Sequence, residues 1–358
     1  MSAYLRHPSP SFRSRFRHST TLHIFLLGLG LTAVIIISSG MGYLKIPVVA
    51  VIKIILNRLS GQLDLIEGID SIFPVVVIDV RLPRILSAAI VGGGLAISGV
   101  VFQGILLNPL ADPYTLGVSA GAAFGASLAL LFNIVFLGTY SVPMFAFIGA
   151  AGTLFFVIYL SSSSGGVSSN NLILSGIIVA AILSAGISFL KYIADEQVAV
   201  IIFWLMGSFA SKTWMDVALT MIFVSCGLGV VIFFARDLNL MSLGKRTASS
   251  LGVDTKRVTI ILLVTASLVA AICVSVSGII GFVGLLVPHM MRLLTGPDNR
   301  RLVPVSLFAG AILLLIADTI TRAVLPSEIP IGVLTALIGG PFFCYVFRKQ
   351  HTTKKTGI

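Results

Sequence analysis

Few residues of this chain have the chemistry to act inside an apolar environment. Asp318 and Arg322 lie four residues apart in an apolar stretch, so on a helix they would share one face and could form an ion pair. His289 and Arg292 follow Pro288 near the end of another apolar stretch, where packing or capping is the simpler interpretation. An ionisable residue within a membrane span is a candidate functional residue. For Asp318 and Arg322, the sequence is equally compatible with a structural and a functional pair.

The sequence lacks the motifs of nucleotide binding, hydrolysis and metal binding. It contains no G-x-x-x-x-G-K-[ST], and the nearest string, at residues 243–247, lacks the first glycine and follows no strand. It contains no H-E-x-x-H and no G-x-S-x-G, and its five histidines are scattered. Cys226, Cys273 and Cys344 all lie in apolar blocks, without the spacing of a metal site. We therefore predict no enzyme activity, no metal site and no cofactor.

The composition determines what kind of elements must hold these residues. Hydrophobic residues make up 57% of the 358 residues and charged residues only 10%, whereas a soluble domain has about 25% charged residues. The mean hydropathy is +1.07. The apolar residues form blocks of about 20 residues, the length of a membrane-spanning helix. Because lipid satisfies no backbone polar group, such blocks must be helical. The sequence therefore predicts an all-α polytopic membrane protein and excludes a soluble enzyme.

We expect about ten transmembrane helices, with both termini in the cytoplasm. The expected spans lie near 22–43, 84–107, 114–132, 141–161, 172–193, 217–235, 258–277, 279–295, 303–323 and 332–347. This arrangement divides the chain into a cytoplasmic tail (1–21), a transmembrane domain (22–347) with an extracytoplasmic segment (44–80) and a cytoplasmic loop (236–257), and a second cytoplasmic tail (348–358). The segment 44–80 is amphipathic and is expected to form a helix at the interface.

The distribution of positive charge supports this orientation. Ten spans place sixteen Lys and Arg residues in the cytoplasm and eight outside, in agreement with the positive-inside rule, whereas nine spans would place the basic C-terminal tail outside. The net charge of +11 then reflects this rule and contact with anionic lipid headgroups rather than nucleic-acid binding. Membrane lipid is therefore an expected partner, and nucleic acid is not.

Two local patterns predict helix packing and a surface helix. Small residues recur at helical spacing and should let helices approach closely; two such stripes are Gly117, Gly121, Gly125 and Gly278, Gly281, Gly284. In the loop 236–257, Leu240, Leu243, Thr247, Ala248 and Leu251 would lie on one face of a single amphipathic helix. Such a helix could lie on lipid or dock in a groove of a partner protein.

The string L-x-x-L-G-x-x-x-A-x-x-L-G, from Leu240 to Gly252, resembles the loop that permeases of the iron-chelate and vitamin B12 uptake family insert into their ATPase subunit. The stretches 81–122, 281–304 and 317–349 resemble the same family and occur in the same order. The resemblance implies a FecCD-type permease of a type II ABC importer, in the cytoplasmic (inner) membrane. It further implies a homodimer, with ten helices in each subunit, a separate ABC ATPase subunit and an extracytoplasmic substrate-binding protein.

The resemblance also implies roles for particular residues. Those implied to dock the ATPase are Leu240, Leu243, Gly244, Ala248, Leu251 and Gly252. The arginines implied to meet acidic residues of the binding protein are Arg81, Arg84 and Arg322, all placed on the outer side by the span count. Asn108 and Leu110 match one cytoplasmic gate of the family. Ser169 and Asn170, after a Ser/Gly-rich stretch suited to a mobile loop, match the second.

The cargo and the transport class are the two open questions. Iron(III)–siderophore is the first expectation, because it is the commonest cargo class of the family, while haem, cobalamin and molybdate remain alternatives. The alternative class is an ion-coupled secondary transporter, which would place coupling carboxylates or broken helices in mid-membrane. Asp318 is the one good candidate in the sequence for such a carboxylate.

Overall fold

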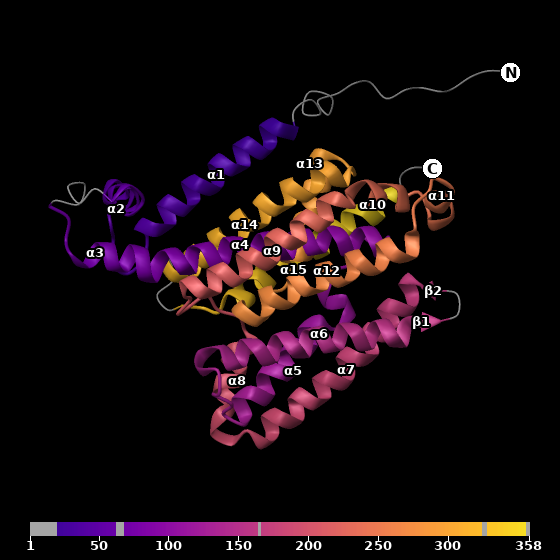
Figure 1. The fold of residues 1–358 in the computed structure, drawn as a ribbon, viewed down its shortest axis with the longest axis horizontal. Coiled ribbons are helices and arrows are strands. Elements are labelled where there is room, and N and C mark those ends of the chain that lie inside the picture. The colour runs from indigo at the N-terminus through magenta and orange to yellow at the C-terminus, as the bar shows by residue number, and fades with distance from the viewer. Residues whose placement is uncertain (1–19, 62–67, 164–165, 324–327, 356–358) are drawn as a thin grey trace.

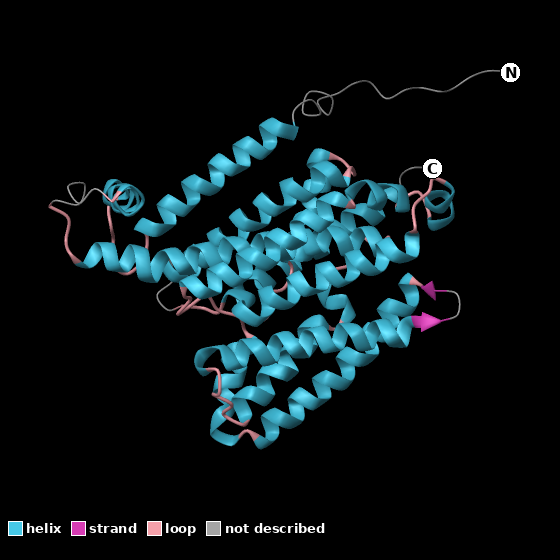
Figure 2. Ribbon diagram, in the orientation of Figure 1, coloured by secondary structure: helices cyan, strands magenta, loops and turns pink. Residues whose placement is uncertain are grey.

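The structure is a computed structural model that describes residues 20–61, 68–163, 166–323 and 328–355. It is almost entirely helical (Figures 1 and 2). The elements are α1 (Thr20–Gly40), α2 (Val48–Ser60), α3 (Ile72–Val75), the π-helical turn η3 (Val76–Arg81), α4 (Leu82–Leu106), η4 (Pro113–Leu116), α5 (Val118–Leu131), η5 (Gly138–Tyr140), α6 (Ser141–Ser161), β1 (Ser162–Ser163), β2 (Gly166–Val167), α7 (Ser169–Ile193), η6 (Asp195–Gln197), α8 (Val198–Leu205), α9 (Trp214–Phe233), α10 (Ala235–Met241), α11 (Lys245–Ser250), α12 (Thr255–Ser277), α13 (Val283–Thr295), α14 (Asn299–Ala323) and α15 (Ile331–Lys355).

The helices agree with the predicted number of about ten spans. Among the described residues, seven helices are long and apolar enough to cross a membrane, and the shorter apolar helices Val118–Leu131, Val283–Thr295 and Ile331–Cys344 bring the number to ten. The largest difference in a boundary is at the second span, which begins at Ile72, through α3 and η3, rather than near residue 84. Helix α2 lies in the predicted extracytoplasmic segment and buries Val51 and Ile54. Residues 1–19 of the predicted N-terminal tail lie outside the described residues.

Helix α4 runs through the centre of the subunit, enclosed by α9, α12, α13 and α14 (Figure 1). In its most apolar segment, 94% of the residues are buried. The neighbouring helices approach closely because glycines face them. A Cβ on Gly99 would overlap the carbonyl oxygen of Gly284 in α13, and one on Gly92 would overlap the carbonyl oxygen of Gly310 in α14. Backbone-to-backbone packing of this kind stabilises helix contacts in lipid, where apolar burial alone drives no association.

A second group of helices, α5 to α8, packs on this centre through α12 (Figure 1). Helices α5 and α6 cross where Gly121 and Gly125 face the backbone at Gly149 and Phe145, so a Cβ on either glycine would overlap a carbonyl oxygen. The predicted close approach is therefore confirmed at Gly121 and Gly125, whereas Gly117 precedes α5 with a φ of 76°. The second predicted stripe is wrong, since α12 ends at Ser277 and α13 begins at Val283, so Gly278 lies between helices with a φ of 72°.

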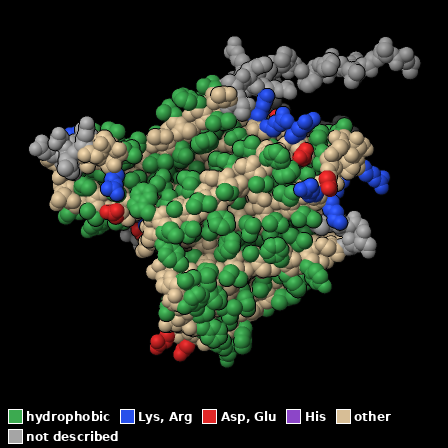
Figure 3. All heavy atoms as spheres, in the orientation of Figure 1, with side chains coloured by type: hydrophobic (Ala, Val, Ile, Leu, Met, Phe, Trp, Pro, Cys, Tyr) green, Lys and Arg blue, Asp and Glu red, His purple; other side chains and the backbone are tan. Residues whose placement is uncertain are grey.

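The surface combines a broad apolar belt with one basic end. In Figure 3, hydrophobic side chains cover most of the visible face, and Lys and Arg gather at the end that carries α10 and α11. The opposite end carries α2 and the start of α3 (Figure 1). The positive-inside rule makes the α10–α11 end cytoplasmic. The two ends therefore face different compartments.

Candidate functional site

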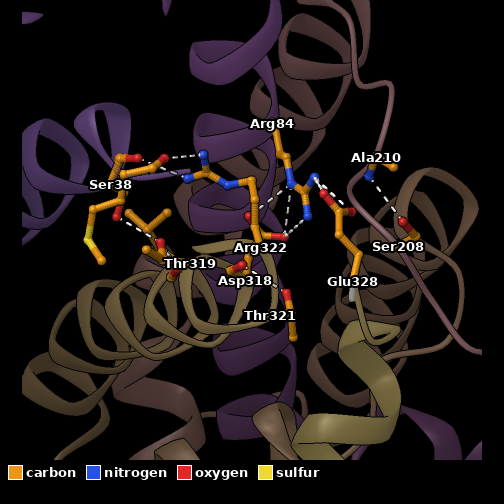
Figure 4. Close-up of polar contacts among 11 residues, drawn as sticks. Ser38, Arg84, Ser208, Ala210, Asp318, Thr319, Thr321, Arg322 and Glu328 are labelled. Carbon is orange, nitrogen blue, oxygen red and sulfur yellow. Dashed lines mark hydrogen bonds and ion pairs between the residues drawn. The ribbon is translucent and has the colours of Figure 1, made fainter. Parts of the chain in front are cut away.

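A cluster of charged residues joins three segments at the outer end (Figure 4). Arg84 of α4 donates from Nε to both carboxylate oxygens of Asp318, at 3.1 Å each, and from Nη2 to Oδ1 at 3.0 Å. Its Nη1 donates to both carboxylate oxygens of Glu328, at 3.2 Å. The Asp318 side chain is 1% exposed and that of Glu328 is 54% exposed. The cluster thus has a buried anion on one side of Arg84 and an exposed anion on the other.

This cluster corrects the pairing expected between Asp318 and Arg322. Asp318 forms its ion pair with Arg84, from a helix far away in the sequence, and not with the arginine one turn along α14. Figure 4 shows the Arg322 guanidinium directed away from Asp318, toward the segment that contains Ser38. Asp318 was also the candidate coupling carboxylate of a secondary transporter. A carboxylate that is already bound by the guanidinium of an arginine is not free to bind a coupling ion, which disfavours that role.

Two arginines hold the outer end of α1. Arg81 donates from Nη1 to the carbonyl oxygen of Ser39 at 2.6 Å and from Nη2 to that of Leu44. Arg322 donates to the carbonyl oxygens of Met41, at 2.6 Å, and Ser38, at 2.9 Å. The last carbonyls of a helix lack intrahelical donors and carry partial negative charge, so cations are favourable there. Both side chains therefore fix α1 and the turn after it against α4 and α14.

The position of Arg81 departs from the prediction that it is presented to an external partner. The residue is only 5% exposed, and its guanidinium binds the main chain of this subunit. Sequence spacing could not show this, because Arg81 lies in the π-helical turn η3 rather than in a regular helix preceding a span. Of the three predicted arginines, Arg84 and Arg322 remain partly exposed. Lys212, at the same end, is close enough to Arg84 for the two charges to repel, although burial is the main reason why the pKa of Lys212 is lowered.

At the inner end, the loop 236–257 forms two short helices instead of the single helix predicted. Helix α10 ends at Met241 and α11 begins at Lys245, and the turn between them contains Gly244 with a φ of 105°, a backbone conformation that favours glycine. The break separates the predicted apolar face. Leu243 is 64% exposed and Leu251 is 58% exposed, whereas Ala248 is fully buried and Leu240 packs against the core. Gly244 and Gly252 both adopt a positive φ next to an exposed leucine.

A polar contact that the sequence did not reveal attaches α10 to the start of α14. Asn239 donates to Asp298 Oδ1 at 2.7 Å, and its own Oδ1 accepts from the backbone and side-chain nitrogens of Asn299, both at 2.8 Å. Asp298 precedes α14 and accepts from the backbone of Arg300, so a helix start at this point was predictable from residue type. The participation of Asn239, some sixty positions earlier, was not.

The two predicted gate segments lie next to each other at the inner end of α4. Helix α4 ends at Leu107, with a φ of 51°, and the Asn108 side chain then accepts from the backbone nitrogen of Leu110 at 3.0 Å. Ser169, the first residue of α7, donates to the carbonyl oxygen of Ile105 at 3.4 Å, and Asn170 beside it is exposed. The loop before α7, predicted to be mobile, contains the short antiparallel pair of β1 and β2.

The turn that follows the loop of Asn108 and Leu110 is stabilised by a capping box. Asp112 accepts from the backbone nitrogen of Thr115 at 3.0 Å and from its hydroxyl at 2.8 Å, while the Asp112 backbone nitrogen donates back at 3.1 Å. Burial raises the pKa of Asp112, and these hydrogen bonds oppose the rise. The capping box fixes where η4 begins, and with it the path of the chain from Asn108 to α5.

Comparisons with known proteins identify the family. The FecCD transport family model matches residues 30–349. The chain belongs to this family. It is 43% identical over 285 residues to the cobalamin import system permease protein BtuC of Halobacterium salinarum, covering 79% of this chain and 76% of the relative. It is 37% identical over 330 residues to the Fe(3+)-citrate import system permease protein YfmE of Bacillus subtilis, covering 91% and 95%.

A solved structure agrees with this family assignment. An inward-facing metal-chelate type ABC transporter matches the fold with a TM-score of 0.79 and 36% identity, covering 91% of this chain and 98% of that one. Together with the apolar helices, these similarities make this member of the FecCD family a multi-pass ABC transporter permease of the inner membrane. The resemblance on which the sequence-based assignment rested is confirmed.

Proposed function

We propose that this FecCD-family chain imports a metal chelate, with iron(III)–siderophore as the cargo, and that a separate ATPase subunit drives it. The proposal rests above all on the family match across residues 30–349. The FecCD relative YfmE is named for Fe(3+)-citrate and the relative BtuC for cobalamin, so identity alone does not select the cargo. Cobalamin and haem are the alternatives within the same machinery.

The ATPase would bind at the exposed leucines of the inner end. Leu243 and Leu251 project from the turn between α10 and α11 and from the end of α11, next to Lys245 and Arg246. Large exposed apolar side chains among basic ones are suited to insertion into a groove of a partner protein. Ala248 would contribute from the inside, by fixing α11 against the core, and not by touching the partner.

The substrate-binding protein would bind at the outer end through Arg84 and Arg322. Acidic side chains of that protein would compete with the exposed Glu328 for the Arg84 guanidinium, near Lys212. Arg81 would support this surface from below, because it holds the turn after α1 in place. The functional unit would be a homodimer, which would present the arginines twice.

The cytoplasmic gate would consist of the loop at Asn108 and Leu110 and the start of α7 at Ser169 and Asn170. Their proximity, through the contact of Ser169 with Ile105, supports joint movement of the two segments. The gate would close the inner end of a wide pathway between the two subunits, in keeping with an ATP-driven importer whose specificity resides in its binding protein.

Uptake by whole cells tests the cargo. Cells with and without this gene are supplied with ⁵⁵Fe-labelled siderophore complexes or with ⁵⁷Co-labelled cobalamin. The proposal predicts that deletion abolishes energy-dependent ⁵⁵Fe uptake and that the restored gene recovers it, while cobalamin uptake is unchanged. If deletion abolished cobalamin uptake alone, the cargo would be cobalamin, and the proposed ABC importer machinery would stand. Uptake that persists when ATP is depleted but an ion gradient remains would support a secondary transporter instead.

A further inference from the structure

The segment proposed to bind the ATPase contacts the central helix at a glycine, where the backbone of α4 is bare. Leu238 of α10 is fully buried, and its side chain lies over Gly104 in the last turn of α4. A Cβ added at Gly104 would lie only 2.8 to 3.0 Å from three carbon atoms of Leu238. Because the glycine has no side chain, Leu238 packs directly on the main chain of α4. Any displacement of α10 toward α4 is therefore passed to the backbone rather than absorbed by a flexible side chain.

The same short helix is anchored on its other side. Asn239, the next residue, binds Asp298 and Asn299 at the start of α14 with hydrogen bonds of 2.7 to 2.8 Å. Asn299 is only 5% exposed, and bonds of this kind cost free energy when broken without replacement. Helix α10 is therefore held between α14 and α4, with Leu238 and Asn239 directed to different neighbours.

The last turn of α4 has partners on its remaining sides. Gln103 donates to the carbonyl oxygen of Leu285 at 3.1 Å and accepts from Arg292 at 3.0 Å, so both ends of its amide bind α13. The carbonyl oxygen of Ile105 accepts from Ser169 of α7 at 3.4 Å. Gln103 is only 3% exposed. Directly after this turn, the helix ends at Leu107, with a φ of 51°, and the chain enters the loop of Asn108 and Leu110.

We propose that the last turn of α4, Gln103–Leu106, is the element through which the ATPase-binding segment moves the cytoplasmic gate. The packing of Leu238 on Gly104 is the contact through which movement of α10 reaches this turn. This inference rests on the proposed function. The turn touches α10, α13 and α7 at once and leads without interruption into the gate loop. A rigid element with contacts at both sites is the physical requirement for coupling between them. Gln103 and Arg292 act as positioning residues that keep the turn against α13.

The test removes the input contact and measures the gate directly. Leu110→Cys is introduced into a chain with Cys226, Cys273 and Cys344 replaced by Ser or Ala, and is co-purified with the ATPase subunit in proteoliposomes. The rate of labelling by a water-soluble maleimide is measured without nucleotide and after trapping with ATP and vanadate. Leu238→Ala is then compared with Leu154→Ala, a matched truncation of a fully buried leucine in α6 that is remote from α10.

The parent chain should show different labelling rates in the two states. Leu238→Ala should retain the ATPase subunit and basal hydrolysis but reduce the ratio of the two rates by about fivefold or more, the lower end of typical coupling between sites. Leu154→Ala should keep the parent ratio. If Leu238→Ala fails to fold, Leu238→Val is used, with a smaller loss expected and Leu154→Val as its control.

An unchanged ratio in the Leu238 variant, with the ATPase still bound, would overturn the proposal and leave the proposed function intact. An equal loss in the Leu154 control would also overturn it, since the effect would then be general destabilisation. A parent chain that binds no ATPase, or whose gate labels at the same rate in both states, would overturn the proposed importer function and this inference with it.

Discussion

Removal of the Asp318 carboxylate should destabilise the subunit far more than removal of the other carboxylate that binds the same arginine. In Asp318→Ala, Arg84 would keep a guanidinium whose side chain is only 12% exposed, and its buried partner would be lost. Breaking a buried pair by removing one partner costs about 3 to 5 kcal/mol. Because Glu328 still contacts the exposed side of Arg84, the lower end of this range is expected. Glu328 is 54% exposed, so Glu328→Gln should cost at most about 1 kcal/mol.

The double variant Arg84→Met with Asp318→Leu separates the charge effect from the loss of packing. It removes both buried charges and keeps apolar volume at both positions, and such replacements are often neutral or stabilising. Its stability should therefore lie near that of the natural chain, well above that of Asp318→Ala. The order expected is natural chain, double variant and Glu328→Gln close together, with Asp318→Ala lowest.

The assay is the fraction of monodisperse protein that remains after heating the purified chain in detergent across a temperature series. All variants are compared at one detergent concentration and one protein concentration, because detergent binding and self-association both shift the midpoint temperature of unfolding. An Asp318→Ala midpoint no lower than that of Glu328→Gln would refute the reasoning. A double variant as unstable as Asp318→Ala would show that packing, and not an unpaired charge, determines the loss.

Three further predictions follow from other parts of the fold. Gly99→Leu should prevent correct folding, measured as aggregation on gel filtration, because even a Cβ there overlaps the backbone of α13; a Gly28→Leu control, at a glycine with no neighbour within 4 Å, should not. Arg81→Gln should loosen the end of α1, measured as faster proteolysis near Leu44 from the outer side, and unchanged cleavage would contradict the role given to Arg81. A cysteine placed at Ser60 should label from the outside and one at Thr247 only from the inside; labelling of both from one side would refute the ten-span topology.

The spans and their number were predictable because lipid imposes a simple rule on the chain. Every apolar block must be a helix of nearly fixed length, so composition and block length determine the architecture before any tertiary contact is known. The 117–125 glycine stripe predicted a close helix crossing for the same reason, since close packing in lipid requires small residues. The break at Gly244 was less apparent from the sequence, because the helical spacing of the leucines through 240–251 continues across it. The break is seen only in the structure, where Gly244 has a positive φ between α10 and α11.

The partners of the charged residues could not be predicted. Asp318 and Arg84 are 234 positions apart, and sequence spacing favoured Arg322, which is one turn away from Asp318 on the same helix. Which arginine forms the ion pair with Asp318 depends on how α4 crosses α14. That crossing depends on the glycines at which the two backbones touch. Arg81 was assigned to the surface because the family resemblance and the span count placed it on the outer side, yet the carbonyl groups at the end of α1 provide it with a buried site.

The measurement that tests the central claim most directly is ATP hydrolysis by the chain alone and by its complex with a candidate ABC ATPase subunit, for the natural chain and for Leu243→Asp. The chain alone should hydrolyse no ATP, and the natural complex should co-purify and hydrolyse it. Leu243→Asp places a charge on the proposed apolar contact and should abolish co-purification while leaving the permease folded. Hydrolysis by the chain alone, or a Leu243→Asp chain that binds the ATPase as tightly as the natural one, would contradict the account.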